Sequence, residues 1–578
     1  MSIASLSKVA LLFPNDEVGP ALRDLQSWGN LHIISQKTAK TGIPENQTEL
    51  ERSQRALSYL SESPDQRTPV KYLSISETEL VDQVLRNQKA RQELLQTMLK
   101  IRVRIQNLKP WGYFNWPTKN HLGGQRLWFY CISPHQKHRI DSHLNVHIVH
   151  EDARHCWLVV VSPNEPSHED MPFQRTHVGQ RTLSELETEL ESAQILLEDL
   201  DAERTAMTRW SELLDRHVTS LLNSNALYNA QLDMQVKGKV TLLLGWCESE
   251  KISDLIQLSR KFKGVLVNQQ LHEKEEPPTL LKNPKALQAA QKLVTFFQFP
   301  GYDDWDPTPV MHVSFILFYA MILADVGYGV ITLGIAAWIH LKHPSSREWS
   351  HFIFQLGFVS VLYGILVGSY FGETPSSISL AGQLHVLDLH NFDQMMLISL
   401  VIGITHLAFG LLVKIRFKTG LERLQTLGWF WLLACALPYL FTENQTLLLS
   451  ASLTPILWVL ASTIYGSGFL NRLYILFSPL MQLSKLFGDV LSYMRLFALG
   501  LASASLAITF NQLSIDIRDA FPGMGVLLSI LILLLGHSLN FALAIMGGVV
   551  HSMRLNCIEF FNWALDKEGY PFNPFKRF

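Results

Sequence analysis

The sequence predicts an α-helical polytopic membrane domain of about eight transmembrane helices, preceded by an N-terminal α+β cytoplasmic arm. The prediction rests first on composition: 47% of the 578 residues are hydrophobic, which is high for a soluble protein, and the chain is too long for one domain. It rests secondly on distribution, because residues 1–306 are rich in charge whereas residues 307–578 hold repeated apolar runs of membrane-spanning length. We therefore expect a domain boundary at residue 306.

The first residues and the cysteines favour a cytoplasmic location for the arm. The start, MSIASLSKVALLFPND, has only a short apolar run before an acidic residue, so it lacks the long apolar core of a secretory signal. The cysteines are scattered without a CxxC pair, which predicts unpaired thiols and neither a disulfide framework nor a zinc site. They are Cys131, Cys156, Cys247, Cys435 and Cys557.

Two long helical patterns in the arm predict an antiparallel coiled coil. Apolar residues that step by three and four begin at Leu80 and at Leu183, and they predict helices over 76–105 and 181–231. Because the segment between them returns the chain, pairing within one chain is simpler than a symmetric dimer. A long helical rod also suits a strut between separated partners.

Strand-length segments predict a small globule at each end of this rod. RLWFYCISPH, LNVHIVHED and CWLVVVS alternate or run apolar and predict a sheet near 106–180. VALLFP and KVTLLLGW predict a second sheet, built from residues near 1–75 together with 232–272.

Basic loops orient the membrane domain. KHPSSREWS and KIRFKTGLER are basic, whereas the loop at 372–394 and the segment TENQ contain no lysine or arginine, so the basic loops should be cytoplasmic. The chain must then cross twice between Pro307 and Lys342, and LADVGYGVI with Asp325 would be the turn. The further expected passes are 352–371, 395–413, 427–441, 447–465, 484–511 and 526–559, and RLYILFSPLMQL could lie along the interface.

The run DVLSYMRLFALGLASASLAITF carries Arg495 well inside an apolar helix. A helical projection places this arginine on a stripe of small and polar residues, while large apolar residues point elsewhere. Small residues allow another helix to approach closely, and a buried ionisable group faces protein or water rather than lipid. The stripe consists of Ser484, Gly488, Ser492, Arg495, Ala498, Ala502, Ser505 and Thr509.

The last apolar run has a matching polar stripe with two histidines. It consists of His537, Asn540, Ala544, Gly547, His551 and Arg554, with Glu559 just past its end. Histidines and a glutamate can exchange protons with water, so the two stripes together are typical of an ion path. The alternative for each histidine is a hydrogen-bonded interior side chain.

The charge of Arg495 must be offset, because a guanidinium at the bilayer centre costs about 2.5 to 3.5 kcal/mol. Asp489 is nearly two turns away, so the counter-ion could lie on another chain. Arginine does not deprotonate in proteins, so its use in an ion path would be as a fixed electrostatic gate that attracts a carboxylate. A snorkelling arginine or a structural ion pair are alternative explanations.

A series of motifs between Lys239 and the C-terminus is distinctive in sequence and in order. They are LLGW, EEPPTLLKNP, DPTP, ILADVGYG, GSYFGE, DVLSYMRLFALGLA, GHSLNFALAIMGGVVHSMRLNCIEFF and EGYPFNPF. With these motifs the chain resembles subunit I of bacterial and archaeal V/A-type ATPases, a family similar to the vacuolar ATPase a subunit. The N-terminal arm agrees with the family in layout only.

The resemblance implies a stator subunit of a rotary ATPase, which forms ion half-channels and couples H⁺ or Na⁺ transport to ATP synthesis or hydrolysis. The implied partners are a rotating proteolipid ring with an ion-carrying carboxylate, peripheral-stalk subunits on the arm, a central-stalk subunit under the ring, and the lipid bilayer. Arg495 matches the gate arginine of the family, Arg554 matches its second arginine, and His551 and Glu559 match polar positions of the last helix. The implied location is the cell (inner) membrane, with the N-terminal arm and the C-terminus cytoplasmic.

Two positions depart from the vacuolar relatives. Those relatives carry a histidine eight residues after the gate arginine, where this chain has Ser503, and an acidic residue where it has Ala544. Their exit route for the ion therefore cannot be transferred intact.

Other classes of protein fit less well. The chain has no GxxxxGK[ST] motif, so we expect no bound nucleotide and no enzymatic activity of its own; we also expect no cofactor, metal or nucleic acid. A self-contained secondary ion or solute transporter is the alternative, although no internal repeat is visible. An intramembrane hydrolase using His537 and His551 would lack a nucleophile or a ligand triad at convincing spacing.

Overall fold

The computed structural model describes residues 3–35, 45–70, 76–117, 122–141, 143–269, 275–375, 380–388, 391–442, 445–451, 453–454, 469–521 and 523–578. These residues fold into two units. Unit 1 comprises Met1–Val18, Gly29–Ile34 and Val236–Phe575, and unit 2 comprises Gly19–Trp28, Ser35–Gln235 and Lys576–Phe578. This division differs from the boundary expected at 306, because the first sheet belongs to the same unit as the apolar helices.

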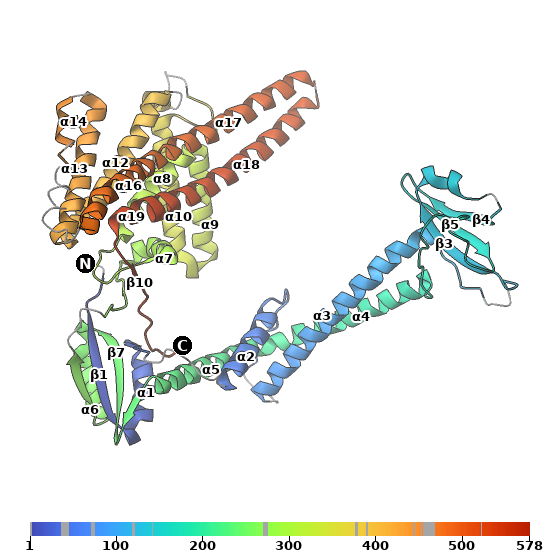
Figure 1. The fold of residues 1–578 in the computed structure, drawn as a ribbon, viewed down its shortest axis with the longest axis horizontal. Helices are drawn as coiled ribbons and strands as arrows, with labels where there is room; N and C mark the ends of the chain where they lie inside the picture. The colour runs from blue at the N-terminus through green and yellow to red at the C-terminus, as the bar shows by residue number, and fades with distance from the viewer. Residues whose placement is uncertain are drawn as a thin grey trace. The chain divides into compact units, whose positions relative to one another are not determined.

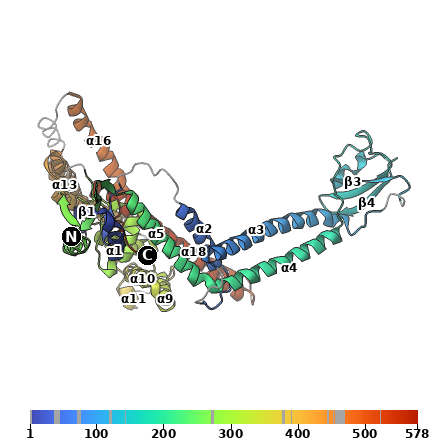
Figure 2. The same cartoon turned by 90° about the horizontal axis from the view of Figure 1, so that it is seen from below.

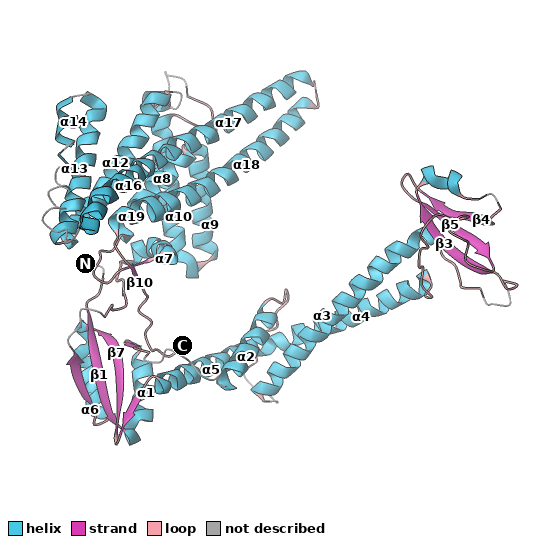
Figure 3. Ribbon diagram, viewed as in Figure 1, coloured by secondary structure: helices cyan, strands magenta, loops and turns pink. Residues whose placement is uncertain are grey.

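An antiparallel sheet begins unit 1, and its strands appear magenta in Figure 3. β1 (Leu6–Pro14) pairs with β7 (Val240–Glu248), the two segments whose apolar runs predict strands. β2 (Leu31–Ile33) and β8 (Val265–Gln269) extend the sheet in the order β2-β7-β1-β8. α6 (Ile252–Lys261) also belongs to this unit, whereas α1 (Val18–Trp28) belongs to unit 2 except for its first residue, and β6 (Gln235–Lys237) begins at the last residue of a unit 2 segment.

The C-terminal segment explains why the sheet and the apolar helices form one unit. β10 (Glu568–Gly569) pairs with β9 (Phe299–Pro300), next to the start of the apolar helices. Further along, the amide of Phe575 donates to the carbonyl of Leu31 in β2 at 2.7 Å. The segment therefore runs from the last apolar helix to the edge of the first sheet.

Two antiparallel helices dominate unit 2. α3 (Glu77–Leu108) lies beside α4 (Leu183–Met207) in both views of Figures 1 and 2. The polar breaks in their apolar seams are paired: Asn87 donates to Glu203 at 2.6 Å, and Arg91 donates to Asp201 at 2.6 Å. A supercoil between the two helices stays a prediction.

The helix expected over 181–231 is divided in the structure. α4 ends at Met207, a short 3₁₀ turn follows, and α5 (Ser211–Leu232) begins. Thr208 contributes to the break, because its hydroxyl donates to the carbonyl of Thr205 and accepts the amide of Arg67. α2 (Glu45–Ser61) packs its apolar residues with those of α3 and α5.

A three-stranded sheet lies at the end of α3 and α4. β3 (Arg126–Ile132), β4 (Val146–Glu151) and β5 (Cys156–Ser162) form it in the order β3-β5-β4. These strands coincide with the three strand-length segments of the sequence. Phe129 of β3 packs with Leu108 and Leu186, which fixes the sheet on the helix ends.

Apolar helices make up the rest of unit 1. Their bounds are α7 (Gln288–Phe297), α8 (Thr308–Leu323), α9 (Val326–Lys342), α10 (Arg347–Val367), α11 (Leu380–Gln383), α12 (Phe392–Phe417), α13 (Gly420–Thr442), α14 (Gln445–Ala451), α16 (Phe469–Ser492), α17 (Met494–Ala520), α18 (Gly525–Arg554) and α19 (Phe561–Ala564). The segment expected to lie along the interface, RLYILFSPLMQL, is part of α16.

Five helical segments of the described chain are long and apolar enough to cross a membrane. They are Arg347–Val367, Phe392–Phe417, Glu422–Thr442, Met481–Ala520 and Gly525–Ala564, and two shorter apolar helices are α8 and α9. The pass expected at 447–465 begins in α14, and most of it lies outside the described residues. The total of about eight passes stays a prediction.

The chain reverses direction between α8 and α9, as LADVGYGVI predicts. α8 ends at Leu323, Ala324 adopts a left-handed conformation (φ 45°), and Asp325 caps α9 by accepting the amide of Tyr328. α10 shows the reversal, because its first turns contact both the middle of α8, through Phe352 and Phe315, and the end of α9. At about 1.5 Å per residue each helix is shorter than a hydrocarbon core of about 30 Å.

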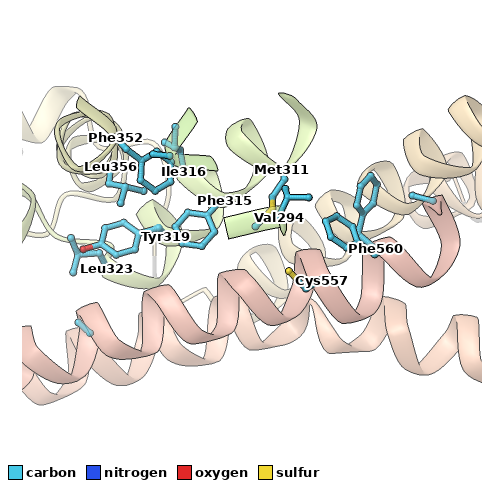
Figure 4. Close-up of a cluster of buried hydrophobic side chains, with 14 of the residues drawn as sticks. Val294, Met311, Phe315, Ile316, Tyr319, Leu323, Phe352, Leu356, Cys557 and Phe560 are labelled. Atoms are coloured by element: carbon cyan, nitrogen blue, oxygen red, sulfur yellow. The ribbon is translucent and has the colours of Figure 1, made fainter. Parts of the chain in front are cut away.

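The core between these helices joins residues far apart in the sequence. Figure 4 shows Met311, Phe315 and Tyr319 of α8 between Phe352 and Leu356 on one side and Cys557 and Phe560 on the other. This core anchors the end of α18 to α8 and so positions the residues that follow Arg554. All five cysteines are free thiols.

Candidate functional site

The small-residue stripe is divided between the end of α16 and α17, and much of it is exposed. The run expected as one helix is interrupted at Tyr493, between α16 and α17. The exposed members of the stripe are Ser484, Gly488, Ala498, Ala502, Ser505 and Thr509. The described part of the chain therefore leaves a face of small side chains that another helix can approach closely.

The two serines predicted as site residues lie on this stripe and bond within their own helices. The hydroxyl of Ser492 donates to the carbonyl of Gly488 at 3.1 Å. Ser505 is exposed, and its carbonyl accepts the hydroxyl of Thr509 at 2.8 Å. Neither contact joins the charged residues of the site.

α18 packs antiparallel against a different face of α17. Ser514 and Ser529 share a hydrogen bond of 2.5 Å, and the Asn540 amide donates to the carbonyl of Ser503 at 2.8 Å. Phe510 fills the space at Gly536, where an added Cβ would lie 2.4 Å from the ring. This pairing brings the start of α17, with Arg495, to the end of α18.

A π-turn at the end of α18 positions Glu559. Residues Leu555–Phe560 form it, and the side-chain amide of Asn556 donates to the backbone carbonyl of Ser552 at 2.9 Å. In a π-turn the backbone hydrogen bonds span five residues and not four, which brings Glu559 close to Arg554, five residues before it. On an unbroken α-helix these two side chains would point in different directions.

Glu559 is the shared counter-ion of two arginines. Its Oε1 lies 3.8 Å from Nη1 of Arg495 and 3.5 Å from Nε of Arg554, and its side chain is 2% exposed. The other oxygen, Oε2, and Nη1 of Arg495 are buried without a hydrogen-bond partner in the described part of the chain. The sequence allowed the counter-ion of Arg495 to lie on another chain, but the structure places one, Glu559, in this chain. Its distances to the two arginines are longer than those of a good hydrogen bond.

His551 lies one turn before Arg554 on α18 and is partly exposed. Its Nδ1 is buried, and no described group bonds to it. The imidazole is thus near the charged cluster with one nitrogen free to accept a proton.

His537 and Asn540 belong to a second polar cluster, centred on Tyr328 of α9. The Tyr328 hydroxyl donates to Nδ1 of His537 at 2.9 Å and accepts the Asn540 amide at 3.0 Å. Nε2 of His537 donates to Asn511 at 3.0 Å, because the amide group of Asn511 is used on the carbonyl of Phe371. Nδ1 of His537 thus accepts one hydrogen bond and Nε2 donates one, which fits a neutral imidazole.

The sequence analysis did not assign Tyr328 and Asn511 to the site. Tyr328 belongs to the motif ILADVGYG, which could have drawn attention to it. Its partner His537, however, lies 209 residues away in the chain. The neighbouring Asp325 is 3% exposed and accepts the hydroxyl of Ser369 at 2.8 Å and the amide of Gly372 at 3.1 Å. Asp325 thus fixes the turn that places Tyr328 beside His537 and Asn540.

His406 of α12 is a further residue that the sequence analysis missed. Its Nδ1 is 2.9 Å from the Tyr493 hydroxyl, and its ring stacks on Phe560 at 4.1 Å with an interplanar angle of 9°. Tyr493 is two residues from Arg495 and Phe560 follows Glu559, so His406 contacts the neighbours of both charges. No apolar periodicity distinguishes such a histidine from an ordinary core residue.

Asp566, which lies beyond the last membrane-spanning segment, is the centre of an ion cluster. Asp566 lies 2.7 Å from Nζ of Lys414 and 2.6 Å from Nζ of Lys418. Burial opposes ionisation of this carboxyl, but the hydrogen bonds from both lysines outweigh it and lower the pKa of Asp566. The pKa of Asp304, whose carboxylate accepts the amides of Asp566 and Lys567, is raised by burial.

The predicted site residues therefore separate into two clusters and an exposed stripe. Arg495, Arg554 and Glu559 meet at one end of the α17–α18 pair, while His537 and Asn540 lie about 26 Å and about 21 Å before Arg554, near the middle of α18. Among the described residues, no group of three or more His, Cys, Asp or Glu side chains could hold a metal ion. The arrangement suits electrostatic control of an ion, with a charged cluster at the end of α18 and a polar cluster near its middle.

Comparison with known proteins finds relatives across most of the chain. The model of the V-type ATPase 116kDa subunit family matches residues 170–372. V-type ATP synthase subunit I of Chlamydia pneumoniae is 25% identical over 595 residues, covering 88% of this chain and 87% of that protein. A-type ATP synthase subunit I of Pyrococcus horikoshii is 28% identical over 477 residues, covering 74% and 70%. The chain is similar to V/A-type ATP synthase subunit I over most of its length.

The resemblance recognised from the motifs is thus confirmed. Among solved structures, the crystal structure of the cytoplasmic N-terminal domain of subunit I, homolog of subunit a, of V-ATPase matches with 13% identity and a TM-score of 0.24, covering 46% of this chain and 100% of that chain. The family model ends at residue 372, before α17 and α18.

Proposed function

We propose that the chain is the stator subunit of the membrane sector of a rotary V/A-type ATPase. Its homologues are named as subunits of V- and A-type ATP synthases, which supports a place in the membrane sector of such a complex. The observation that carries the finer proposal is the exposed small-residue face of α17 with Arg495 at its start. A rotating proteolipid ring would pass along this face, and the ion would be H⁺ or Na⁺.

The proposed gate works because the guanidinium of Arg495 keeps its charge. In the chain alone, Glu559 offsets that charge through a contact of 3.8 Å, and the same carboxylate oxygen also contacts Arg554. A ring carboxylate arriving at α17 would compete with Glu559 for Arg495 and release its ion in doing so. When the ring moves on, Glu559 takes back the arginine, so the guanidinium is never left without a counter-charge.

The two polar clusters are the proposed ends of the ion path. His551 and Glu559, beside Arg554, would line the place of exchange with water at one end, and His537, with its partners Asn540 and Tyr328, would line it at the other. Arg495 would prevent a cation from passing directly between them. Ser503 and Ala544, which replace a histidine and an acidic residue of the vacuolar relatives, have no ion-exchanging role in this proposal.

The arm is proposed to bind peripheral-stalk subunits, and a central-stalk subunit would lie under the ring. Within unit 2, α3 and α4 run side by side to the sheet of β3, β4 and β5, a layout suited to a strut. Catalysis would belong to a separate nucleotide-hydrolysing head, with the chain itself non-catalytic. The location proposed is the cell (inner) membrane, with the arm and the C-terminus cytoplasmic.

Purification from native membranes tests the proposal. A stator subunit copurifies with a nucleotide-hydrolysing head and a small proteolipid, whereas a secondary transporter, the alternative that the named homologues do not favour, binds solute alone. Crosslinking sharpens the test: Ala502→Cys on the exposed face should crosslink to cysteines in the ring helix. Ala507→Cys, on a face 1% exposed, is the matched control and should not. Crosslinking from Ala507 alone would contradict the assigned face.

A further inference from the structure

A groove between α9 and α10 is not used by the proposed function. It encloses about 700 Å³ where α9 ends and α10 begins. Its apolar lining, here called the floor, consists of Ala286, Ala336, Ala337, Leu341 and Phe354, of which Ala336 is buried and the others are exposed. The groove opens where the basic loop KHPSSREWS joins the two helices, at the end predicted to be cytoplasmic.

The rim of the groove is basic. Lys285 and Arg347 stand on it, together with His340 and His351. The one acidic lining residue, Glu348, is already paired with Lys292 at 2.5 Å. Within the described part of the chain, neither Lys285 nor Arg347 forms an ion pair, so the rim carries uncompensated positive charge.

Large apolar side chains continue from the groove onto the outer surface of the helices. Leu341 is 81% exposed, Phe354 is 49% exposed and Trp338 of α9 is 55% exposed. A tryptophan beside basic residues at a helix end is typical of the boundary between lipid tails and headgroups. The groove therefore joins a surface suited to acyl chains with a rim suited to an anion.

We propose that this groove binds an anionic phospholipid of the surrounding bilayer. The phosphate would lie between Lys285 and Arg347, where a guanidinium can hold it through two hydrogen bonds, and the first turn of α10 adds partial positive charge. The acyl chains would lie along Leu341 and Phe354. A zwitterionic lipid carries its own cation and gains less from the same rim, so the site should select for net negative charge.

Native mass spectrometry of the full chain can test this site. The chain is reconstituted in vesicles of equal parts phosphatidylglycerol and phosphatidylcholine, extracted in mild detergent, and its retained lipids are counted. Phosphatidylglycerol should be retained preferentially, and Lys285→Gln with Arg347→Gln should lower its occupancy by about fivefold for each charge removed. Arg416→Gln is the matched control, because Arg416 is an exposed basic residue at the end of another helix, and it should leave the occupancy unchanged.

Two further arms separate a lipid from a free anion. Inorganic phosphate should not displace the retained lipid, and Phe354→Ala should weaken retention of phosphatidylglycerol, since only a lipid uses the apolar floor. Displacement by phosphate, equal retention of phosphatidylcholine, or an equal loss in Arg416→Gln would each overturn the proposal. Thermal unfolding of the lipid-free variants shows that any loss of lipid is not a loss of fold.

Discussion

Replacing Glu559 by glutamine tests the gate most directly. The glutamine has the same shape and can still donate or accept hydrogen bonds, but it removes the only charge that contacts both Arg495 and Arg554 within the described part of the chain. Nη1 of Arg495 and Nε of Arg554 both lie within 4 Å of the same oxygen, Oε1 of Glu559, so the two guanidinium groups are close to each other. Glu559→Gln therefore leaves two cations close together without a carboxylate between them.

The stability cost follows from these distances and from the burial. At an effective dielectric constant of about 20, contacts of this length are each worth roughly 4 to 5 kcal/mol before desolvation. Breaking a buried pair costs about 3 to 5 kcal/mol. The side chains of Arg495 and Arg554 are 23% and 50% exposed, so water screens part of the repulsion, and we expect a net loss of about 2 to 3 kcal/mol.

Glu559→Gln should slow ion pumping without abolishing it. Without Glu559, nothing competes with a ring carboxylate for Arg495, so that carboxylate leaves more slowly. If half of the lost energy reappears as tighter binding of the ring, turnover falls roughly tenfold. The arginine itself still separates the two ends of the ion path.

The assay is ATP-driven ion pumping by the reconstituted complex, normalised to assembled complex on native gels, with thermal unfolding measured in parallel. Asp566→Asn is the matched control, because Asp566 also pairs with two cations but lies beyond the last apolar helix. It should lower stability while leaving pumping per assembled complex unchanged.

Two results would refute the reasoning. Complete loss of pumping in Glu559→Gln with full assembly would make Glu559 an obligatory ion carrier and not a counter-ion. Wild-type pumping and wild-type stability together would show that its contacts with the arginines contribute nothing.

Further predictions concern the gate, the topology and the ion cluster at the end of the last helix. Arg495→Ala should abolish pumping while the complex still assembles, and Arg495→Lys should fail largely because an ammonium lacks the guanidinium fork and can deprotonate when desolvated; near-normal pumping by the alanine variant would reject the gate. A single cysteine at Ser346 should be shielded from an impermeant thiol reagent in intact cells, whereas one at Gln383 should react; the reverse pattern would contradict the positive-inside assignment. The folded-state pKa of Asp566 is below its unfolded value, so its ion pairs with Lys418 and Lys414 stabilise the fold above the ordinary carboxyl pKa of 3.8 and lose that effect as the pH falls through the folded value. The difference in thermal stability between wild type and Asp566→Asn should accordingly be full near neutral pH and should shrink under acid; a difference that grows below pH 4 would have the wrong sign.

Local patterns were enough to find many elements of this protein, although not the breaks at Thr208 and Tyr493. The alternation of β1 and β7, the seams of α3 and α4, and the apolar runs of the membrane helices all depend on side chains a few residues apart, so they are visible in one dimension. The same holds for the turn at Asp325, where glycines and a capping carboxylate act within four residues. The small-residue stripe of Arg495 was likewise readable, because an α-helix repeats its faces at a known period.

Only the tertiary structure decided which charges meet. Glu559 reaches Arg495 because a π-turn changes the helical period at residue 555 and because α8 packs against that turn, and neither cause is expressed in the spacing of the two residues. The bonds that join Tyr328 to His537 and Phe575 to Leu31 likewise connect distant segments. Sequence periodicity records which face a residue occupies on its own helix, whereas the partner of that face depends on packing between helices, where many pairings of apolar surface have similar energies.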